Sequence, residues 1–380
     1  MDIAFIGPDA RLYRAASDGS AVAPLSGDDG AGRRAENWPA WSPDGRWLAF
    51  SRMQLRDDAL TAGAVYVTSN DGQHQAEVIA AEQFAPIYLS WSPDSRWLTL
   101  LLQDQDGLSL HLAEILDGRP GALHPIDRGA PLFTSWSADS HQLFMHVGGD
   151  RRVAAGARLA LLEVEGASQP RILEMAPASF NAPACAPDGS GWAYASPVAE
   201  RDGLFVEQDG QSRLLAEGHG FAFNWAPNDG RLAFTSQASP ADNFYTGLAL
   251  GSERSQVRQL VPEDRLVAFF WAPDGQWLAY FSPTADGLTL TVIDADGRNP
   301  RPLAAFTPTN EFTQLVSFFD QYAQSHRLWS PDSSHILFAG TRSAGNGASN
   351  RPHVFSAAAD GSSPPGPIAD GVIGFFSPVL

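Results

Sequence analysis

Five polar side chains lie close together in one short segment near the end of the chain. They are Asp320, Gln321, Tyr322, Ser325 and His326. A carboxylate, an amide, two hydroxyls and an imidazole can hydrogen-bond a ligand or a partner, so we treat these as candidate binding residues. A histidine and an aspartate alone do not make a catalytic site. The segment therefore predicts binding rather than a reaction centre.

The common catalytic and metal-binding motifs are absent from the rest of the sequence. There is no Gly-x-Ser-x-Gly, His-Glu-x-x-His or Cys-x-x-Cys, and the calcium-loop start at 104–107 meets Ala113 where a glutamate is required. All 25 basic residues are arginine, which excludes sites that need a lysine. His141 and His146 flank one predicted strand, and we interpret them as polar positions. We expect no catalytic residue, no metal and no cofactor.

The net charge restricts the partners that this chain can bind. It is −18, from 43 acidic and 25 basic residues. Such a balance disfavours nucleic acid, anionic membranes and acidic polysaccharides. A protein partner with a basic or apolar surface is favoured instead.

Targeting signals are missing from the sequence as it stands. Residues 1–7 have no basic region and only a short apolar run, so they do not resemble a signal peptide. Apolar stretches such as 266–272 are too short to cross a bilayer. Cys185 is the only cysteine, so nothing calls for an oxidising compartment. We expect a cytoplasmic protein without direct membrane insertion, and the sequence permits a soluble subunit of a membrane-associated complex.

A repeated sequence motif predicts the scaffold that positions the candidate binding residues. Residues 41–50 read WSPDGRWLAF and residues 91–100 read WSPDSRWLTL. The first position of this motif recurs at Trp41, Trp91, Trp136, Cys185, Trp225, Trp271 and Trp329, with spacings of 50, 45, 49, 40, 46 and 58 residues. A period of 40 to 50 residues is typical of propellers built from four-stranded blades.

Each repeat contains the signals for four strands. One strand runs into the tryptophan, a Pro-Asp-Gly or Pro-Asp-Ser turn follows, and a second strand such as 47–50 leaves it. A third strand such as 64–67 ends at an Asp-Gly turn, and a fourth such as 75–80 closes the unit. Four antiparallel strands per repeat predict an all-β propeller.

The two ends of the chain complement each other. The C-terminal Phe376-Ser-Pro-Val-Leu and the N-terminal Met-Asp-Ile-Ala-Phe together match one repeat position by position. We therefore expect a single domain over residues 1–380, with blade 1 formed by 371–380 plus 1–28. The predicted fold is an eight-bladed propeller closed by the C-terminal strand. A seven-bladed ring with a detached N-terminal arm is the alternative.

The Trp-Ser-Pro-Asp-Gly-x-x-Leu-Ala-Phe motif and the later Asp-Gly turn resemble the TolB-type, WD40-like (PD40) propeller repeat family. The resemblance covers the whole chain and implies the propeller fold. It does not imply a function, because one propeller scaffold hosts many unrelated activities. TolB itself is periplasmic and has an additional N-terminal domain, so its role is not transferred.

The recurring aromatic residues are interpreted as structural. We expect the six tryptophans named above, and Phe376 in the same position, to fill the space between neighbouring blades. Cys185 takes that position once and is expected to behave as a small buried hydrophobe. The repeated aspartates are turn residues rather than a ring of metal ligands.

Topology predicts two different faces. If the Pro-Asp and Asp-Gly turns share one face, the loops between second and third strands and the crossings between blades share the other. The variable loops 52–63, 148–156, 236–244 and 341–352 belong to this second face. Because function tends to reside on variable loops, we assign recognition to this loop-rich face and to the mouth of the central channel.

A helical insertion is predicted at about 307–326, between blades 7 and 8. Phe312, Leu315, Val316, Phe319 and Tyr322 are spaced as one face of a helix. In one interpretation the helix caps the channel with its apolar side on the ring. In the other it brings the five candidate residues to a ligand or partner.

The leading hypothesis is a non-enzymatic scaffold for protein–protein interaction. The rival is a propeller enzyme or small-ligand binder. Similar oligogalacturonate lyases place a His-coordinated metal in the channel, but this chain has no clustered histidines and is acidic. The propeller half of a prolyl-oligopeptidase-like peptidase is a further alternative, and it would need a separate catalytic partner.

Overall fold

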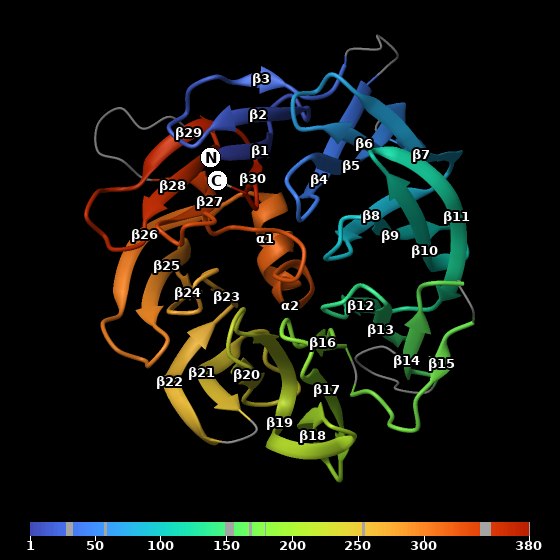
Figure 1. Cartoon of the computed structure of the whole chain (residues 1–380). Coiled ribbons are helices and arrows are strands. Elements are labelled where there is room, and N and C mark those ends of the chain that lie inside the picture. Colours follow the sequence, from blue (N-terminus) through green and yellow to red (C-terminus); the bar gives the residue numbers. More distant parts are fainter. Residues whose placement is uncertain are drawn as a thin grey trace.

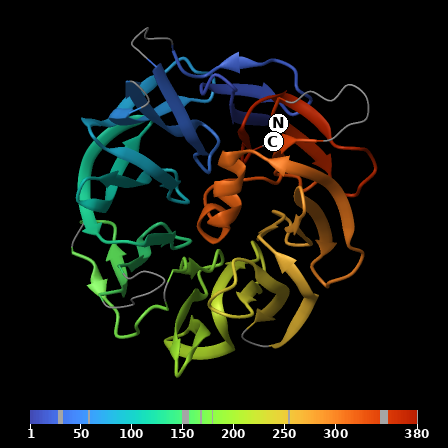
Figure 2. The same ribbon diagram turned by 180° about the vertical axis from the view of Figure 1, so that it is seen from behind.

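Antiparallel sheets form a ring around two short helices (Figure 1). The helices lie at the centre of the ring from the opposite side as well (Figure 2). This computed structural model describes residues 1–27, 33–56, 59–148, 156–166, 169–178, 180–252, 255–342 and 351–379. Within these ranges, neither α1 (Asn310–Ser317) nor α2 (Phe319–Tyr322) has the length or apolar character of a membrane-spanning helix.

Four of the sheets have four strands each. The first runs β3 (Ala23–Pro24), β2 (Leu12–Ala16), β1 (Asp2–Ile6), β30 (Ile373–Phe376). The second runs β4 (Arg33–Trp41), β5 (Trp47–Arg56), β6 (Ala59–Ser69), β7 (Gln75–Glu82). The third runs β8 (Ala85–Trp91), β9 (Trp97–Asp104), β10 (Gly107–Leu116), β11 (Arg119–Arg128). The fourth runs β12 (Leu132–Trp136), β13 (Gln142–Val147), β14 (Arg158–Glu163), β15 (Arg171–Ile172).

Two further sheets have seven strands each. One runs β16 (Ala184–Cys185), β17 (Gly191–Val198), β18 (Arg201–Gln208), β19 (Gln211–Trp225), β20 (Leu232–Gln237), β21 (Tyr245–Ser252), β22 (Ser255–Leu266). The other runs β23 (Ala268–Trp271), β24 (Trp277–Thr284), β25 (Gly287–Asp294), β26 (Arg301–Pro308), β27 (His335–Thr341), β28 (His353–Ala358), β29 (Gly366–Asp370).

Strands that pair on both sides, β19 and β26, explain the larger sheets. β19 pairs with β18 up to Gly218 and with β20 from His219 onward, so one strand serves two neighbouring groups. β26 pairs with β25 over most of its length and meets β27 only at Thr307 and Pro308. The inner position beside β27 is taken by Trp329, which bridges Ile336.

The two ends of the chain meet in the first sheet. β30 pairs antiparallel with β1, with Phe376 opposite Ile3 and Ile373 opposite Ile6. The backbone N–H of Ser377 also donates to the Asp2 carbonyl at 2.8 Å. The predicted ring closure depends on this pairing.

Burial falls from the centre of the ring to its rim. In β9, every residue from Trp97 to Leu102 is buried. In the outer strand β7, no residue is fully buried. Strands near the centre are covered on both faces by neighbouring sheets, so they are continuously apolar instead of alternating.

Five of the six repeat tryptophans are tied to the inner strand before them. Five indole Nε1–H groups donate to a carbonyl of the preceding inner strand, at 2.9 to 3.3 Å: Trp41 to Phe375, Trp91 to Ala40, Trp225 to Ala184, Trp271 to Asn224 and Trp329 to Phe270. A buried indole needs such an acceptor. The aromatic residues thus pack between sheets and also link them.

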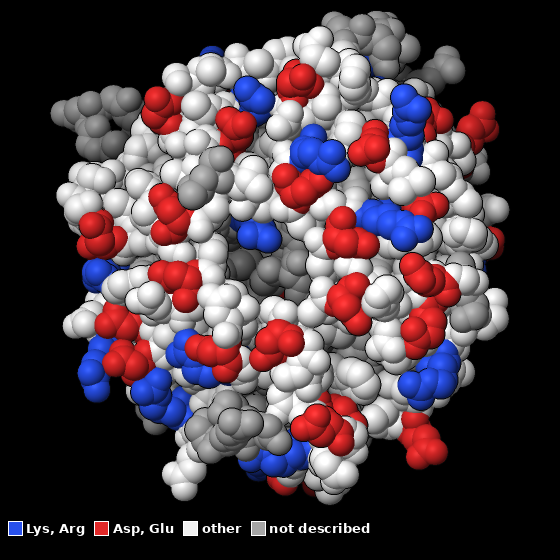
Figure 3. Space-filling view, in the orientation of Figure 1, with Lys and Arg blue, Asp and Glu red and all other residues white. Residues whose placement is uncertain are grey.

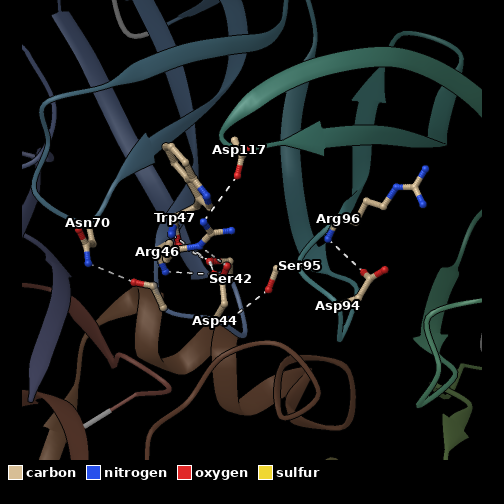
Figure 4. Close-up of polar contacts among 10 residues, drawn as sticks. Ser42, Asp44, Arg46, Trp47, Asn70, Asp94, Ser95, Arg96 and Asp117 are labelled. Carbon is tan, nitrogen blue, oxygen red and sulfur yellow. Dashed lines mark hydrogen bonds and ion pairs between the residues drawn. The ribbon is translucent and has the colours of Figure 1, made fainter.

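The Pro-Asp turns repeat one hydrogen-bond pattern (Figure 4). Ser42 Oγ donates to Asp44 Oδ1 at 2.6 Å, and the same oxygen accepts from the Arg46 backbone N–H at 3.1 Å. Equivalent Ser–Asp pairs form at 92–94, 137–139 and 330–332. The short polar side chains thus stabilise the turn through its own backbone.

Serine replaces glycine in some turns for a structural reason. Ser95, Ser140 and Ser333 have φ values of 61° to 65°, where glycine is favoured. Their hydroxyls accept hydrogen bonds from the backbone N–H of Asp44, Asp94 and Asp274 in the preceding turn, at 3.0 to 3.1 Å. Figure 4 shows the first of these links. The strain is offset by a bond between turns.

We predict that Ser95→Ala lowers the free energy of unfolding by about 1–2 kcal/mol. The variant keeps the left-handed backbone but loses the bond to the Asp44 N–H. Ser95→Gly should lose less, because glycine relieves the backbone strain. Urea denaturation of both variants checks this, and two variants as stable as the parent would contradict it.

Candidate functional site

The insertion between β26 and Trp329 begins with a capped helix. Thr309 Oγ1 accepts from the Phe312 backbone N–H at 3.1 Å and donates to the Val372 carbonyl at 2.6 Å. The predicted start at Pro308 and Asn310 is therefore one residue on either side of the cap. Phe312, Leu315 and Val316 are buried, which directs this helix against the ring.

The predicted continuous helical face is broken at Phe318. This residue has φ −124° and ψ 34° and separates α1 from the four-residue α2. The break lets the Phe319 ring pack at 4.9 Å from Phe269 and 6.1 Å from Phe270, both on an inner strand. Aromatic packing against β23 thus outweighs the continuation of the helix.

Asp320 is buried and faces the backbone of the ring. Its Oδ2 accepts from the Ala182 N–H at 3.0 Å, and its Oδ1 accepts from the Gln321 N–H at 3.1 Å. Only 8% of the residue is exposed. Burial raises the pKa of this carboxyl to about 6, despite those two hydrogen bonds.

The side-chain amide of Gln321 hydrogen-bonds to the backbone of the inner strand β12, as the backbone of a neighbouring strand would. Its Oε1 accepts from the Thr134 N–H and its Nε2 donates to the Thr134 carbonyl, both at 2.8 Å. Nε2 also donates to the Tyr88 hydroxyl at 2.9 Å. The side-chain amide thereby satisfies backbone groups of β12 that face the channel.

Tyr88, Ser325 and His326 form a chain of hydrogen bonds. The Tyr88 hydroxyl donates to Ser325 Oγ at 2.7 Å, and that oxygen lies 2.7 Å from His326 Nδ1. The imidazole lies among aromatic rings, with centroids 4.7 Å from Phe375 and 5.1 Å from Tyr322. Tyr322 and His326 are both buried, and Ser325 is half-buried.

Burial lowers the pKa of His326 to about 3. An imidazole that resists protonation is a weak general base, because the most effective base has a pKa near the working pH. The Ser325–His326 contact is therefore poorly suited to activating a nucleophile. Within the described ranges, no group of three or more His, Cys, Asp or Glu residues is placed to hold a metal ion.

The structure brings all five candidate residues together but does not expose them as expected. Asp320, Gln321, Tyr322 and His326 are buried inside the channel, so they anchor the insertion rather than face a partner at a mouth. Of the five, Ser325 and His326 line an open cavity, although His326 is only 3% exposed. The interpretation in which the insertion packs on the ring describes these four residues better.

The cavity lies on the side of the Pro-Asp turns. It has a volume of about 560 Å³, and its floor is the segment from Ala323 to Leu328. Its wall contains Trp41, Trp91, Trp136, Trp225, Trp271 and Trp329, together with prolines of the turns and Cys185. Burial raises the pKa of the Cys185 thiol to about 12, which makes it unreactive. Figure 3 shows a hollow at the centre of the ring, with acidic side chains spaced around it.

Arg327 and Asn224 are among the polar residues of this cavity that the sequence did not point to. Arg327 contributes to the floor and Asn224 to the wall. An arginine directly after the five polar residues was the available signal. Asn224 comes one residue before a repeat tryptophan, and that position by itself does not indicate a place in the cavity.

No family model and no curated protein matches this sequence. Solved structures match it, and those named below are 10 to 13% identical to it. A prolyl endopeptidase has 11% identity and a TM-score of 0.62 over 90% of this chain, which spans only 50% of that protein. An oligogalacturonate lyase in complex with manganese has 13% identity and a TM-score of 0.57, covering 93% of this chain and 95% of the lyase.

The propeller domain of the Trilobed protease from Pyrococcus furiosus is a further match. It has 10% identity and a TM-score of 0.52, covering 89% of this chain and 98% of that domain. TolB from Acinetobacter baumannii is more distant, with 13% identity and a TM-score of 0.44 over 77% of this chain and 75% of TolB. At these identities the likeness shows the fold alone, which is an all-β propeller.

We predict that Gln321→Ala lowers the free energy of unfolding by about 2–4 kcal/mol, because it leaves buried groups of Thr134 and Tyr88 unpaired. Gln75→Ala on the exposed strand β7 is the matched control and should change little. Thermal and urea denaturation of both variants test this. Equal stability of the two variants would show that the amide does not anchor the insertion.

Asp320→Asn should show a pH-dependent gain in stability. The pKa of Asp320 is higher in the folded protein than in the unfolded chain. The free energy of unfolding is therefore highest below about pH 4, where the carboxyl is protonated in both states, and it falls as the pH rises through about 6. Asparagine keeps the acceptor for the Ala182 N–H without a charge. The variant should therefore be more stable by about 1–3 kcal/mol at pH 7, a difference that disappears near pH 4.

Urea unfolding of parent and variant at several pH values measures this difference. Asp106→Asn, which changes an exposed turn carboxyl, serves as the control. A constant difference between Asp320→Asn and the parent from pH 4 to 7 would contradict the buried-carboxyl account.

Proposed function

We propose that this chain is a non-enzymatic β-propeller that binds a partner protein at the central cavity on the side of the Pro-Asp turns. One observation carries the proposal. The reactive side chains of the insertion are buried and engaged in holding it inside the channel, whereas the cavity beneath it stays open. Large apolar cavities with a few convergent polar groups are typical of binding sites.

The chemistry of His326 supports binding over catalysis. The nearest approach to a catalytic pair is Ser325 with His326, at 2.7 Å. The lowered pKa of that imidazole opposes a general-base role. A nucleophile without an effective base gives little rate enhancement.

The surroundings of the cavity favour a basic or apolar partner. Pro43, Pro93 and Pro273 line the cavity, and each is followed by an aspartate of its turn. Acidic side chains are spaced around the hollow at the centre of the ring in Figure 3. Such a rim attracts positive charge and repels polyanions.

The proposal includes an eight-bladed ring closed by β30. The sheet from β16 to β22 divides at β19 into two groups of four. In the sheet from β23 to β29, Trp329 supplies the inner position beside β27, β28 and β29, and the pairing of β30 with β1 completes the first group. The seven-bladed alternative would leave β1 to β3 outside the ring. Closure holds the walls of the cavity in fixed positions, which lowers the cost of binding.

The loop-rich face is the competing location for the same function. Parts of its loops, at 57–58, 149–155 and 343–350, lie outside the described residues. The loop at 236–244 is described and exposes Asn243. The cytoplasmic location and the role as a subunit of a membrane-associated complex stay predictions.

Site-specific photo-cross-linking separates the two faces. A benzoyl-phenylalanine at Ala138, on the cavity wall, should capture a discrete partner in extracts of the native host. The same group at Asn243, on the loop-rich face, is the matched control and should capture none. Mass spectrometry of the cross-linked species identifies the partner and the site.

Cross-links formed from Asn243 alone would move the function to the loop-rich face. Capture from neither position would argue against a protein partner. A stoichiometric metal in the purified protein that is lost on His326→Ala would favour the lyase-like alternative.

A further inference from the structure

The cavity presents one charged donor that no other described residue satisfies, the guanidinium of Arg327. Trp136 and Asn224 also line the cavity, and each has a buried nitrogen without a described partner, but these nitrogens are closed off from solvent. A cation that lines a cavity without an acidic partner indicates a ligand that brings a negative charge.

Trp136 differs from the other cavity tryptophans. Its Nε1 is buried and has no hydrogen-bond partner among the described residues, whereas five equivalent indoles donate to a carbonyl. Asn224 also has a buried nitrogen without a partner. Its carbonyl accepts from Trp271 Nε1, but its Nδ2 is buried without a described partner, and the residue is only 6% exposed.

Arg327 supplies the charge. Its carbonyl accepts from the Phe376 N–H at 2.9 Å, which fixes the backbone against β30. The side chain makes no hydrogen bond or ion pair with another described residue, and it lines the cavity with an exposed surface. The surrounding atoms lower the pKa of the guanidinium by desolvation, with no acidic group beside it to offset this. A bound anion would provide the missing partner.

The shape and charge of the surroundings restrict that anion. The wall is built of indole rings and proline rings, which favour an apolar or aromatic body. Aspartates follow the wall prolines around the mouth, and they disfavour ligands with several negative charges. A single carboxylate on an apolar body satisfies both conditions, and a phosphate or a polyanion does not.

We propose that the cavity binds one carboxylate carried on an apolar body, with the carboxylate paired to Arg327 and its body against the ring of tryptophans. The inference rests on the proposed function, in which the carboxylate is the free C-terminus of the partner protein. The same chemistry could be supplied by a small apolar acid. The acidic rim then favours basic residues a few positions before the C-terminus.

The test uses the whole chain and defined probes. Two synthetic tetrapeptide libraries, one with free C-termini and one with amidated C-termini, are bound to immobilised protein, and 3-phenylpropionate and inorganic phosphate are titrated separately. Free-acid peptides with apolar C-terminal residues should be enriched at least about tenfold over the amides, the range of a charge-assisted hydrogen bond. Phosphate should bind at least about tenfold more weakly.

Arg327→Gln should abolish this preference, and Arg327→Lys should restore part of it, because lysine keeps the charge without the bidentate geometry. Arg298→Gln removes an equal charge from an exposed turn and is the matched control. Since no described side chain depends on Arg327, the variants should melt within a few degrees of the parent, and thermal denaturation verifies that they are folded.

The outcomes separate the two proposals. Equal binding of acids and amides, or a neutral Arg327→Gln, would overturn the carboxylate site whatever the cross-linking shows. Binding of 3-phenylpropionate equal to the best peptide, lost in Arg327→Gln, would support the carboxylate site but count against a protein partner. Binding of no carboxylate probe at all would also overturn the site.

Discussion

The hydrogen bond from a buried indole to the preceding inner strand is the interaction on which the rest of the ring depends. A buried indole N–H without an acceptor is costly, so each such strand requires its neighbour at a fixed distance. The bonds from Trp91 to Ala40 and from Trp225 to Ala184, both 2.9 Å, are examples. Together with the serine links between turns, they make each sheet a part of its neighbours' structure.

A ring built in this way leaves inner-strand backbone groups facing its own channel. The insertion satisfies some of them with side chains, as Gln321 does for Thr134 and Asp320 does for Ala182. This use of polar residues explains why a segment rich in hydrogen-bonding groups is buried. It also explains why its histidine is neutral and its carboxyl is reluctant to ionise.

The insertion fills the channel only in part. Below it, the ring of tryptophans and prolines stays open around Arg327, and the acidic turns surround the opening. Among the described residues, Arg327 is one cation within a hollow that indole and proline rings line, whereas the rim around the hollow is acidic, so the two regions attract opposite charges. They are compatible with one kind of occupant, which carries a single negative charge at its tip and apolar or basic groups behind it.

The sequence by itself determined the all-β propeller class, because the tryptophan, the Pro-Asp turn and the Asp-Gly turn are local signals that recur with each four-stranded unit. It also predicted a helical insertion near 307–326 that carries the five polar residues. Tertiary structure decided that Asp320, Gln321, Tyr322 and His326 are buried and that the cavity opens on the turn side. The direction of a side chain within the channel depends on contacts between residues nearly two hundred positions apart, such as Gln321 with Thr134, and no local pattern encodes such contacts.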